Sequence, residues 1–394
     1  MSANKPRTAD VVIIGGGIVG AGTAYELARR GFKVVVLERG APNREGSGTT
    51  AGNLHIQAIH TRRPGQEVPL DNVRFLPLQK TASDLWNDLE EKLDADIELT
   101  RNGGFMVAET EEQVSELHIK HKYEANFGIP SELLTGDEAR GFLPSLSDHL
   151  LGADWCPLDG YANPLLVTPA YIAAARREGA IVRGFSPVTA VRKTRSGFAS
   201  YSLDDVWHSP YVVNVSGPWI GEIAALSGIS LQMTPVAIQM HITTRADTDV
   251  LQHLVQHIGE GMSVKQVSAG NVLIGGGWPS QSFQSTGRSR IDEDSIFGNL
   301  LQAVRVLPFL RNLQLLRSWA GPLAATPDEM PVIGEVPGAP GYFVAGGTYS
   351  FTFAPLWATT LADLISHDVP LQPIDDLGPS RLMIKPAELL SNSI

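Results

Sequence analysis

Residues 10–39 read DVVIIGGGIVGAGTAYELARRGFKVVVLER, and this stretch decides the fold. The apolar run at 11–14 predicts a buried strand, and the glycines that follow it have the spacing GxGxxG. Residues 18–30 carry the periodicity of a helix, and residues 33–37 predict a second buried strand that ends in an acid, Glu38. Strand, glycine turn, helix and strand form a βαβ unit, which predicts a dinucleotide-binding site.

Each glycine of this turn has a physical role. Gly15 permits the tight turn, Gly17 lets the backbone approach a pyrophosphate, and Gly20 lets the helix pack close to the strand. The helix N-terminus offers free N–H groups to phosphates, and Glu38 can accept hydrogen bonds from both ribose hydroxyls. GxGxxG alone also occurs in flexible loops, but the strands and the helix around it favour the dinucleotide site.

Length and composition limit the remaining possibilities. A chain of 394 residues is too long for one simple core, so two lobes are expected. The net charge is −11 and the basic residues are dispersed, which argues against binding to nucleic acid or an anionic membrane. Cys156 is the only cysteine, so the chain can hold no internal disulfide and no iron–sulfur or Cys-based zinc site. We expect it to be a small buried residue, and we predict no metal site.

The N-terminal residues and the hydropathy bear on location. Residues 1–10 lack the charged-then-apolar layout of a signal peptide, and no apolar run approaches the roughly 18 residues of a membrane span. We therefore expect a cytoplasmic protein.

After the βαβ unit, the first half of the chain predicts a loop, several helices and a strand at 103–108. A glycine-rich loop at 40–53 follows the second strand at the edge of the sheet where ligands bind. Residues 73–93 predict a helix with a core-facing stripe, and residues 111–126 an acidic helix on the surface. Thr168 and Pro169 predict the start of another helix, with threonine as N-cap.

The middle section of the chain, at about 238–274, is antiparallel in character. A second strand-to-helix junction follows at SGPW, residues 216–219. Residues 238–243 alternate as a half-exposed strand does, and residues 264–274 predict a hairpin. The predicted strands before and after this region lie at 181–183, 188–193, 198–203, 211–215 and 342–345.

Six segments in the same order resemble the D-amino acid oxidase family of flavoproteins, which includes glycine oxidase, sarcosine oxidase and the catalytic subunits of opine oxidases. They are the βαβ unit, the loop with Ala51-Gly52-Asn53, LDGYANP with its helix, VVNVSGPW, TPDEMPVIG, and the final strand, glycine turn and helix. The resemblance spans residues 10 to about 367. Within the family, the chain looks most like the FAD subunits of octopine and nopaline oxidases.

The resemblance implies an α/β fold with a Rossmann-like FAD-binding domain and a discontinuous α+β substrate domain on a mainly antiparallel sheet. The expected bounds are 1–85, 150–225 and 320–380 for the FAD-binding domain, 86–149 and 226–319 for the substrate domain, and 381–394 for a tail.

FAD is the implied cofactor, with Ala51, Gly52 and Asn53 along the isoalloxazine and the terminal turn at the flavin edge that gains negative charge on reduction. The first turn and the resemblance together predict the cofactor-binding residues Gly15, Gly17, Ile18, Val19, Gly20, Glu38, Arg39, Gly46, Ser47, Ala51, Gly52, Asn53, Val188, Ser216, Gly217, Trp219, Gly346, Gly347, Thr348, Phe351 and Thr352.

In this family the flavin performs the chemistry: the substrate α C–H leaves as hydride to N5, and the resulting imine is hydrolysed by water. No strong acid or base is then required, and the catalytic residues are not assigned. The pocket candidates are His55, His60, His241, Lys265 and Tyr349, although a hydrogen-bonded structural role is at least as common for such histidines.

The chain departs from the family pattern at three places, which bear on the substrate and on how the flavin is held. Relatives that oxidise simple amino acids place an arginine before TPD, where this chain has Leu323. Relatives with covalent flavin carry a cysteine in that turn, where this chain has Gly321, so FAD should be non-covalent. The terminal turn, GGTYSF, is about two residues shorter than usual.

The missing arginine and the resemblance to opine oxidase subunits together imply oxidation of the C–N bond of an N-substituted amino acid such as an opine, by the catalytic subunit of a hetero-oligomer. A partner subunit would carry further redox centres, flavin or iron–sulfur. Two alternatives stay open: a stand-alone glycine, sarcosine or D-amino acid oxidase that makes H2O2, and a non-catalytic flavin-binding assembly subunit.

Overall fold

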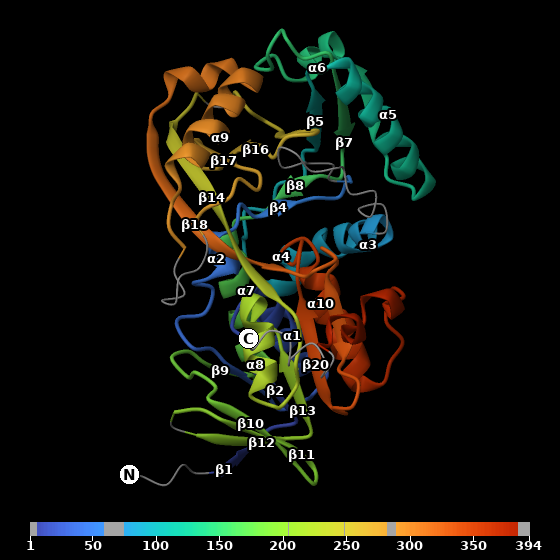
Figure 1. Cartoon of the computed structure of the whole chain (residues 1–394), viewed down its shortest axis with the longest axis vertical. Coiled ribbons are helices and arrows are strands. Elements are labelled where there is room, and N and C mark those ends of the chain that lie inside the picture. The colour runs from blue at the N-terminus through green and yellow to red at the C-terminus, as the bar shows by residue number, and fades with distance from the viewer. Residues whose placement is uncertain (1–5, 59–74, 204, 248, 282–288, 385–394) are drawn as a thin grey trace, which may run out of the picture.

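A computed structural model describes residues 6–58, 75–203, 205–247, 249–281 and 289–384. Figure 1 shows two sheet-centred lobes stacked along the long axis, with the larger antiparallel sheet at the upper end. The chain passes between the lobes several times, so each lobe is built from segments far apart in the sequence.

The lower lobe contains a six-stranded sheet. Its strands, in spatial order, are β19 (Val332–Glu335), β20 (Tyr342–Gly346), β13 (Tyr211–Asn214), β2 (Val11–Ile14), β3 (Val34–Leu37) and β9 (Ile181–Arg183). All neighbours are parallel except β19 and β20. Alternate residues of β2 enter different cores, which explains why its sequence is apolar throughout.

Both faces of this sheet are covered. Helices α1 (Ile18–Arg29), α7 (Pro164–Arg177) and α10 (Ala354–Ser366) pack on one face, together with α3 (Leu76–Trp86). The other face packs on α8 (Ile220–Ala225) and on a four-stranded sheet. The strands of that sheet are β1 (Pro6–Thr8), β12 (Val206–Ser209), β11 (Gly197–Tyr201) and β10 (Ala190–Thr194).

The upper lobe is an eight-stranded sheet in which only the β15–β5 pair is parallel. Its strands, in spatial order, are β18 (Leu315–Ala325), β14 (Thr234–Arg245), β17 (Asn271–Gly275), β16 (Ser263–Gln266), β15 (Leu254–His257), β5 (Gly104–Ala108), β7 (Gly152–Cys156) and β6 (Glu132–Thr135). Helices α6 (Gly136–Phe142) and α9 (Glu293–Val306) share a core with one face, and α5 (Glu111–Asn126) packs on the other.

The remaining elements are short. They are α2 (Gly46–Thr49), α4 (Leu89–Leu93), the two-stranded pair β4 (Asn53–Leu54) and β8 (Gly160–Tyr161), and the 3-10 turns at Gly217–Trp219, Pro308–Asn312, Asp375–Leu377 and Pro379–Leu382.

The architecture confirms the predicted α/β class, the parallel sheet of the first lobe and the antiparallel sheet of the second. The division into domains stays a prediction. Strand β7, which the predicted bounds assign to the FAD-binding domain, pairs with β5 in the upper sheet.

Three local predictions were wrong. Helix α7 begins at Pro164 rather than Pro169, because Asn163 caps it: the Asn163 side chain accepts from Leu165 N at 3.0 Å. The described part of the single helix predicted at 73–93 forms two helices, α3 and α4. Helix α5 is not simply a surface helix, because it buries Lys120 and Glu124 completely.

Within the described ranges, no helix is long and apolar enough to span a bilayer, and no cluster of three potential metal ligands forms. Cys156 is buried, as expected.

Candidate active site

The first glycine turn is close-packed. Gly15 has φ +119°, and a Cβ there would lie 2.6 Å from the Val215 oxygen. A Cβ at Gly20 would lie 2.0 Å from the Gly15 oxygen, so this glycine sets how close α1 packs to the turn. Gly17 has an ordinary φ of −80° and is the N-cap of α1. Of the three glycines, Gly17 is therefore the one whose backbone conformation other residues could also adopt. Its role is to leave space for a ligand where a side chain would stand.

Glu38 closes the other side of this turn. One carboxylate oxygen accepts from Gly16 N at 2.7 Å, and the other accepts from Gly40 N at 2.8 Å. These two bonds fix the orientation of the carboxylate and leave further lone pairs on both oxygens. Next to it, the Arg39 guanidinium lies 3.6 Å from the centre of the Trp219 ring, which is cation–π geometry.

The loop before β4 is held between α1 and β18. The Ser47 hydroxyl accepts from Ile18 N at 2.9 Å, which satisfies one of the free N–H groups at the start of α1. On the other side, a Cβ at Gly46 would come within 2.7 Å of the Pro322 oxygen. The loop therefore depends on both lobes for its position.

Two adjoining cavities follow from this arrangement. The glycine-loop cavity is lined by Gly15, Glu38, Arg39, Val188, Ser216 and Trp219. The central cavity, of about 310 Å³, is lined by Ile18, Val19, Ala51, Asn53, His55, Gly346, Gly347, Thr348, Tyr349, Phe351 and Thr352. Gly17, Gly46, Ser47 and Gly217 line both.

Nearly all residues predicted to bind the cofactor thus come together, although they lie in five separate segments. Gly20 and Gly52 do not line either cavity. Gly52 has φ +75°, and a Cβ there would lie 2.2 Å from the Ala162 oxygen. Its role is to let the chain turn tightly against the segment before α7.

Asn53 ties the two lobes together. Its side-chain amide donates to the Ser263 hydroxyl at 2.5 Å and accepts from Lys265 Nζ at 2.9 Å. Its backbone oxygen accepts from the Thr352 hydroxyl at 3.3 Å, which connects β4 to the terminal turn.

Lys265 lies behind this loop rather than in the central cavity. Its Nζ donates to the Ala51 oxygen and lies 4.4 Å from the centre of the Tyr161 ring. Lys265 is 2% exposed and lines a third cavity on the far side of residues 50–51. Burial lowers the pKa of the Lys265 ammonium well below its ordinary value.

His55 lines the central cavity. Burial, with the nearby Lys265 charge, lowers the pKa of His55 to about 4, although a hydrogen bond with Gln256 acts in the opposite direction. The ring is therefore neutral at physiological pH. Its Nδ1 is buried and has no hydrogen-bond partner in the described part of the chain.

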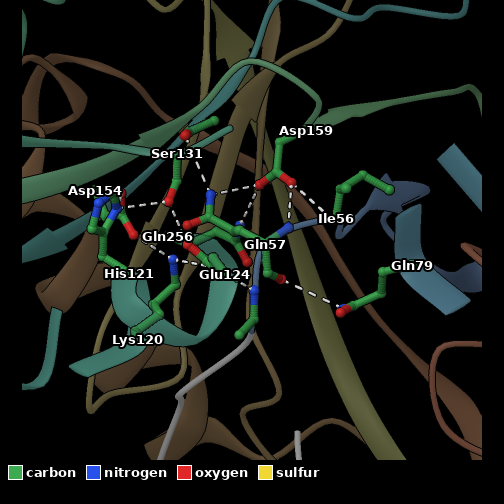
Figure 2. A network of polar contacts seen from close by, with 12 residues as sticks. Ile56, Gln57, Gln79, Lys120, His121, Glu124, Ser131, Asp154, Asp159 and Gln256 are labelled. Carbon is green, nitrogen blue, oxygen red and sulfur yellow. Dashed lines mark hydrogen bonds and ion pairs between the residues drawn. The ribbon is translucent and has the colours of Figure 1, made fainter. Parts of the chain in front are cut away.

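A buried polar network supports the segment that follows His55 (Figure 2). The Asp159 carboxylate accepts from the backbone N–H groups of Ile56 at 2.8 Å and Gln57 at 3.1 Å. It also accepts from the side chains of Gln57 at 2.7 Å and Gln256 at 3.2 Å. Burial raises the pKa of Asp159, and these donors oppose that shift.

A second cluster continues the network on α5 (Figure 2). Lys120 Nζ contacts Glu124 at 2.6 Å and Asp154 at 2.7 Å, and all three side chains are buried. Glu124 in turn accepts from Ala58 N at 2.7 Å. Neither cluster was predicted, although LDGYANP contains Asp159; no periodicity distinguishes a buried carboxylate of this kind from a solvated one.

The remaining predicted pocket residues divide three ways. Tyr349 lines the central cavity. His241 does not, because it lies on the opposite face of β14 from Met240, which does line it. The His241 ring is buried with Nδ1 2.8 Å from the Ser318 hydroxyl, and burial lowers its pKa to about 4. His60 lies outside the described residues.

The central cavity carries little charge. Among the described residues that line it there is no arginine and no lysine, and Leu323 lies at the wall. A side chain at Gly321 would come within 2.1 Å of the Thr49 hydroxyl, so this position has no space for a cysteine.

The cleft fits a flavin dinucleotide. A Cβ at Gly17 would lie 2.8 Å from the Ser47 hydroxyl, and the N-terminus of α1 opens beside it. A cavity with largely apolar walls continues from there past Ala51 and Asn53. A glycine turn on the first strand of a parallel sheet, continuous with such a cavity, defines a dinucleotide-dependent oxidoreductase.

Comparison with known proteins makes this class specific. The chain belongs to the family described as DAO, FAD dependent oxidoreductase, whose model matches residues 10–364. This confirms the family and the cofactor predicted from the sequence, and the chain is therefore an FAD-dependent oxidoreductase.

Individual relatives are 26% to 29% identical to the chain over the aligned residues. Glycine oxidase of Geobacillus kaustophilus (strain HTA426) is 29% identical over 362 residues, which cover 91% of this chain and 93% of that protein. The crystal structure of glycine oxidase from Geobacillus kaustophilus superposes with a TM-score of 0.85 at 28% identity, over 95% of this chain and 99% of that one.

Two other relatives carry different activities in their names. An opine oxidase subunit of Agrobacterium tumefaciens (strain Ach5) is 26% identical over 364 residues, 91% of this chain and 93% of that protein. Mitochondrial sarcosine dehydrogenase of Mus musculus is 27% identical over 358 residues, 87% of this chain, but the match spans only 38% of that relative's length.

Proposed function

We propose that this chain oxidises the C–N bond of an N-substituted amino acid, such as an opine, as the FAD-containing subunit of a hetero-oligomeric dehydrogenase or oxidase. Bound FAD supplies the chemistry by accepting hydride from the substrate. The observation that carries the substrate class is the wall of the central cavity, where Leu323 stands in place of a cationic anchor for a small amino acid.

The chain's own residues would hold the cofactor without a covalent bond. We propose that the glycine-loop cavity takes the adenosine and pyrophosphate, with Glu38 on the ribose, and that Ala51 and Asn53 lie along the ring system. The packing of Gly321 against Thr49 supports a non-covalent flavin. Because Cys156 is the only cysteine, electrons would leave through a partner that carries further redox centres.

A stand-alone oxidase of glycine, sarcosine or a D-amino acid is the second candidate. The full-length match to glycine oxidase favours it, whereas the match to the opine oxidase subunit favours the subunit role. A non-catalytic flavin-binding assembly subunit is the third. It predicts a flavin that no substrate reduces.

One experiment separates the three. The FAD-loaded chain is mixed anaerobically with octopine, nopaline, sarcosine, proline, glycine and D-alanine, and loss of flavin absorbance is recorded. Bleaching by an opine, with slow peroxide formation in air, supports the proposal. Brisk peroxide formation from glycine or D-alanine identifies the stand-alone oxidase, and no bleaching by any compound identifies the assembly subunit.

Leu323→Arg is the matched variant. If Leu323 replaces a carboxylate anchor, an arginine there should improve reduction by glycine about tenfold relative to octopine, because it adds one charged hydrogen bond to a small substrate. An unchanged ratio would show that this position does not set the substrate class.

A further inference from the structure

Tyr349 occupies an unusual backbone position beside the central cavity. It lies in the turn between β20 and α10 and has φ +59°, the left-handed conformation that bulky residues rarely adopt. Such a conformation persists only where the surrounding structure enforces it, and it is concentrated at binding sites.

Aromatic packing holds the Tyr349 ring in place. Its centroid lies 5.8 Å from that of Phe75, 6.2 Å from that of Phe353 and 6.3 Å from that of His55, all edge to face. The ring therefore has little freedom to rotate, and the hydroxyl is fixed relative to the cavity wall.

The Tyr349 hydroxyl is an open donor. It makes no hydrogen bond to any residue that the structure describes, and it is not among the polar atoms buried without a partner. Burial and the charge of Glu329 raise the pKa of the phenol, so it keeps its proton. Because Tyr349 lines the central cavity and its hydroxyl has no partner among the described residues, the hydroxyl is available to a ligand there.

Many other polar side chains of this cavity already make hydrogen bonds within the protein. Asn53 is held by Ser263 and Lys265, and Gln256 donates to Asp159. Four hydroxyl groups donate to backbone oxygens, namely those of Thr49, Thr348, Ser350 and Thr352. With no arginine or lysine among the described lining residues, a carboxylate has few strong donors to bind.

We propose that the Tyr349 hydroxyl donates a hydrogen bond to the substrate carboxylate and replaces a cationic anchor. The proposal rests on the function proposed above and names the residue that would recognise the substrate's acid group. A neutral anchor has a chemical advantage here: it holds an anion without placing a positive charge near the iminium that forms as hydride leaves.

The test uses Tyr349→Phe in the FAD-loaded chain, with Tyr25→Phe as the control. The control substitution also removes one phenol hydroxyl. That hydroxyl donates to the backbone oxygen of Lys92, on α4, at 3.1 Å, and Tyr25 lines neither cavity. Acetate, which has a carboxylate and no amine, is titrated while the flavin spectrum is recorded, and acetamide is titrated in parallel.

The expected result is acetate binding that is about 10- to 100-fold weaker in Tyr349→Phe than in the wild type, as for loss of a hydrogen bond to a charged group. Acetamide binding, the thermal unfolding temperature and Tyr25→Phe should stay unchanged. With an amino acid that reduces the flavin, the substrate concentration for half-maximal flavin reduction should rise by the same factor, while the limiting rate of reduction changes little.

Equal acetate affinity in Tyr349→Phe and wild type overturns the proposal, as does a wild-type spectrum that acetate leaves unchanged. Because this titration needs no turnover, its outcome is independent of the substrate. A flavin that acetate perturbs through Tyr349 but that no N-substituted amino acid reduces would contradict the proposed function and leave the carboxylate site intact.

Discussion

The two cavities of the cleft are built in different ways. The glycine-loop cavity is shaped by backbone: glycines at the turn, free N–H groups at the start of α1, and a carboxylate that two further N–H groups hold. The central cavity is shaped by side chains from β14, β16 and β18 and from the terminal turn. A backbone-built site should tolerate side-chain changes and fail when a Cβ is added, whereas a side-chain-built site should behave in the opposite way.

Gly17→Ala should give the largest effect. Its φ of −80° suits alanine, so the turn should still fold, but the new Cβ would lie 2.8 Å from the Ser47 hydroxyl, where we propose that the pyrophosphate binds. FAD affinity should fall about 100- to 1000-fold, or roughly 3 to 4 kcal/mol. Equilibrium dialysis of the apoprotein with FAD measures this.

Circular dichroism and the thermal unfolding temperature of the Gly17→Ala apoprotein serve as controls and should match those of the wild-type apoprotein. FAD binding within tenfold of the wild type would show that this turn does not approach the cofactor.

Asp159→Asn tests the other cavity. An amide presents two hydrogens where the carboxylate accepts from Ile56, Gln57 and Gln256, so at least one buried donor loses its acceptor. The free energy of unfolding should drop by about 2 to 4 kcal/mol. Urea unfolding followed by tryptophan fluorescence measures the change. FAD content after purification should stay close to one per chain, in contrast to Gly17→Ala.

Substrate reduction of the flavin should weaken in Asp159→Asn, because the Asp159–Gln256 connection also positions His55. A variant that is destabilised but reduces at the wild-type rate would mean that the network supports the fold alone.

This difference between the cavities also explains what could be predicted from sequence. The glycine turn and Glu38 are close in sequence, and their function depends on spacing and on a missing Cβ, so the motif specifies the site. His55 and Tyr349 are 294 positions apart and meet only because β4 and the terminal turn both line the central cavity. Each could be suggested as a pocket residue, but their contact could not.

His241 and Lys265 show where the prediction fails. Both lie on strands of the upper sheet, where a shift of one residue turns a side chain to the other face. The neighbour of His241, Met240, reaches the central cavity, whereas Lys265 lies behind the loop before β4, where its Nζ donates to the Ala51 oxygen. Sequence identifies the strand, but the register that decides which face is used comes from the paired strands.

The buried cluster of Lys120, Glu124 and Asp154 predicts that the free energy of unfolding depends on pH. Burial, opposed by Lys120 and reinforced by Asp154, raises the pKa of Glu124 to about 7, above its ordinary value near 4.5. Between about pH 5 and about pH 7 the folded chain therefore binds more protons than the unfolded chain, so stability falls as pH rises. The expected loss is about 1 to 3 kcal/mol.

Glu124→Gln removes this titration and keeps the side-chain size. Its urea unfolding curves should vary less with pH over that interval than those of the wild type. If the unfolding free energies of both proteins changed equally with pH, another group would bind the proton and Glu124 would not explain the effect.

Arg39→Ala should have the smallest effect and completes the comparison. The Arg39 guanidinium stacks on Trp219 at the mouth of the glycine-loop cavity and is half-exposed, so water competes for the interaction. FAD affinity should fall only about 2- to 5-fold, the size of an exposed cation–π contact. Arg39→Lys keeps the charge and loses the planar stacking, so an intermediate affinity is expected. If Arg39→Ala instead weakened FAD as much as Gly17→Ala, side chains would dominate the glycine-loop cavity too, and the division between a backbone-built and a side-chain-built half would be lost.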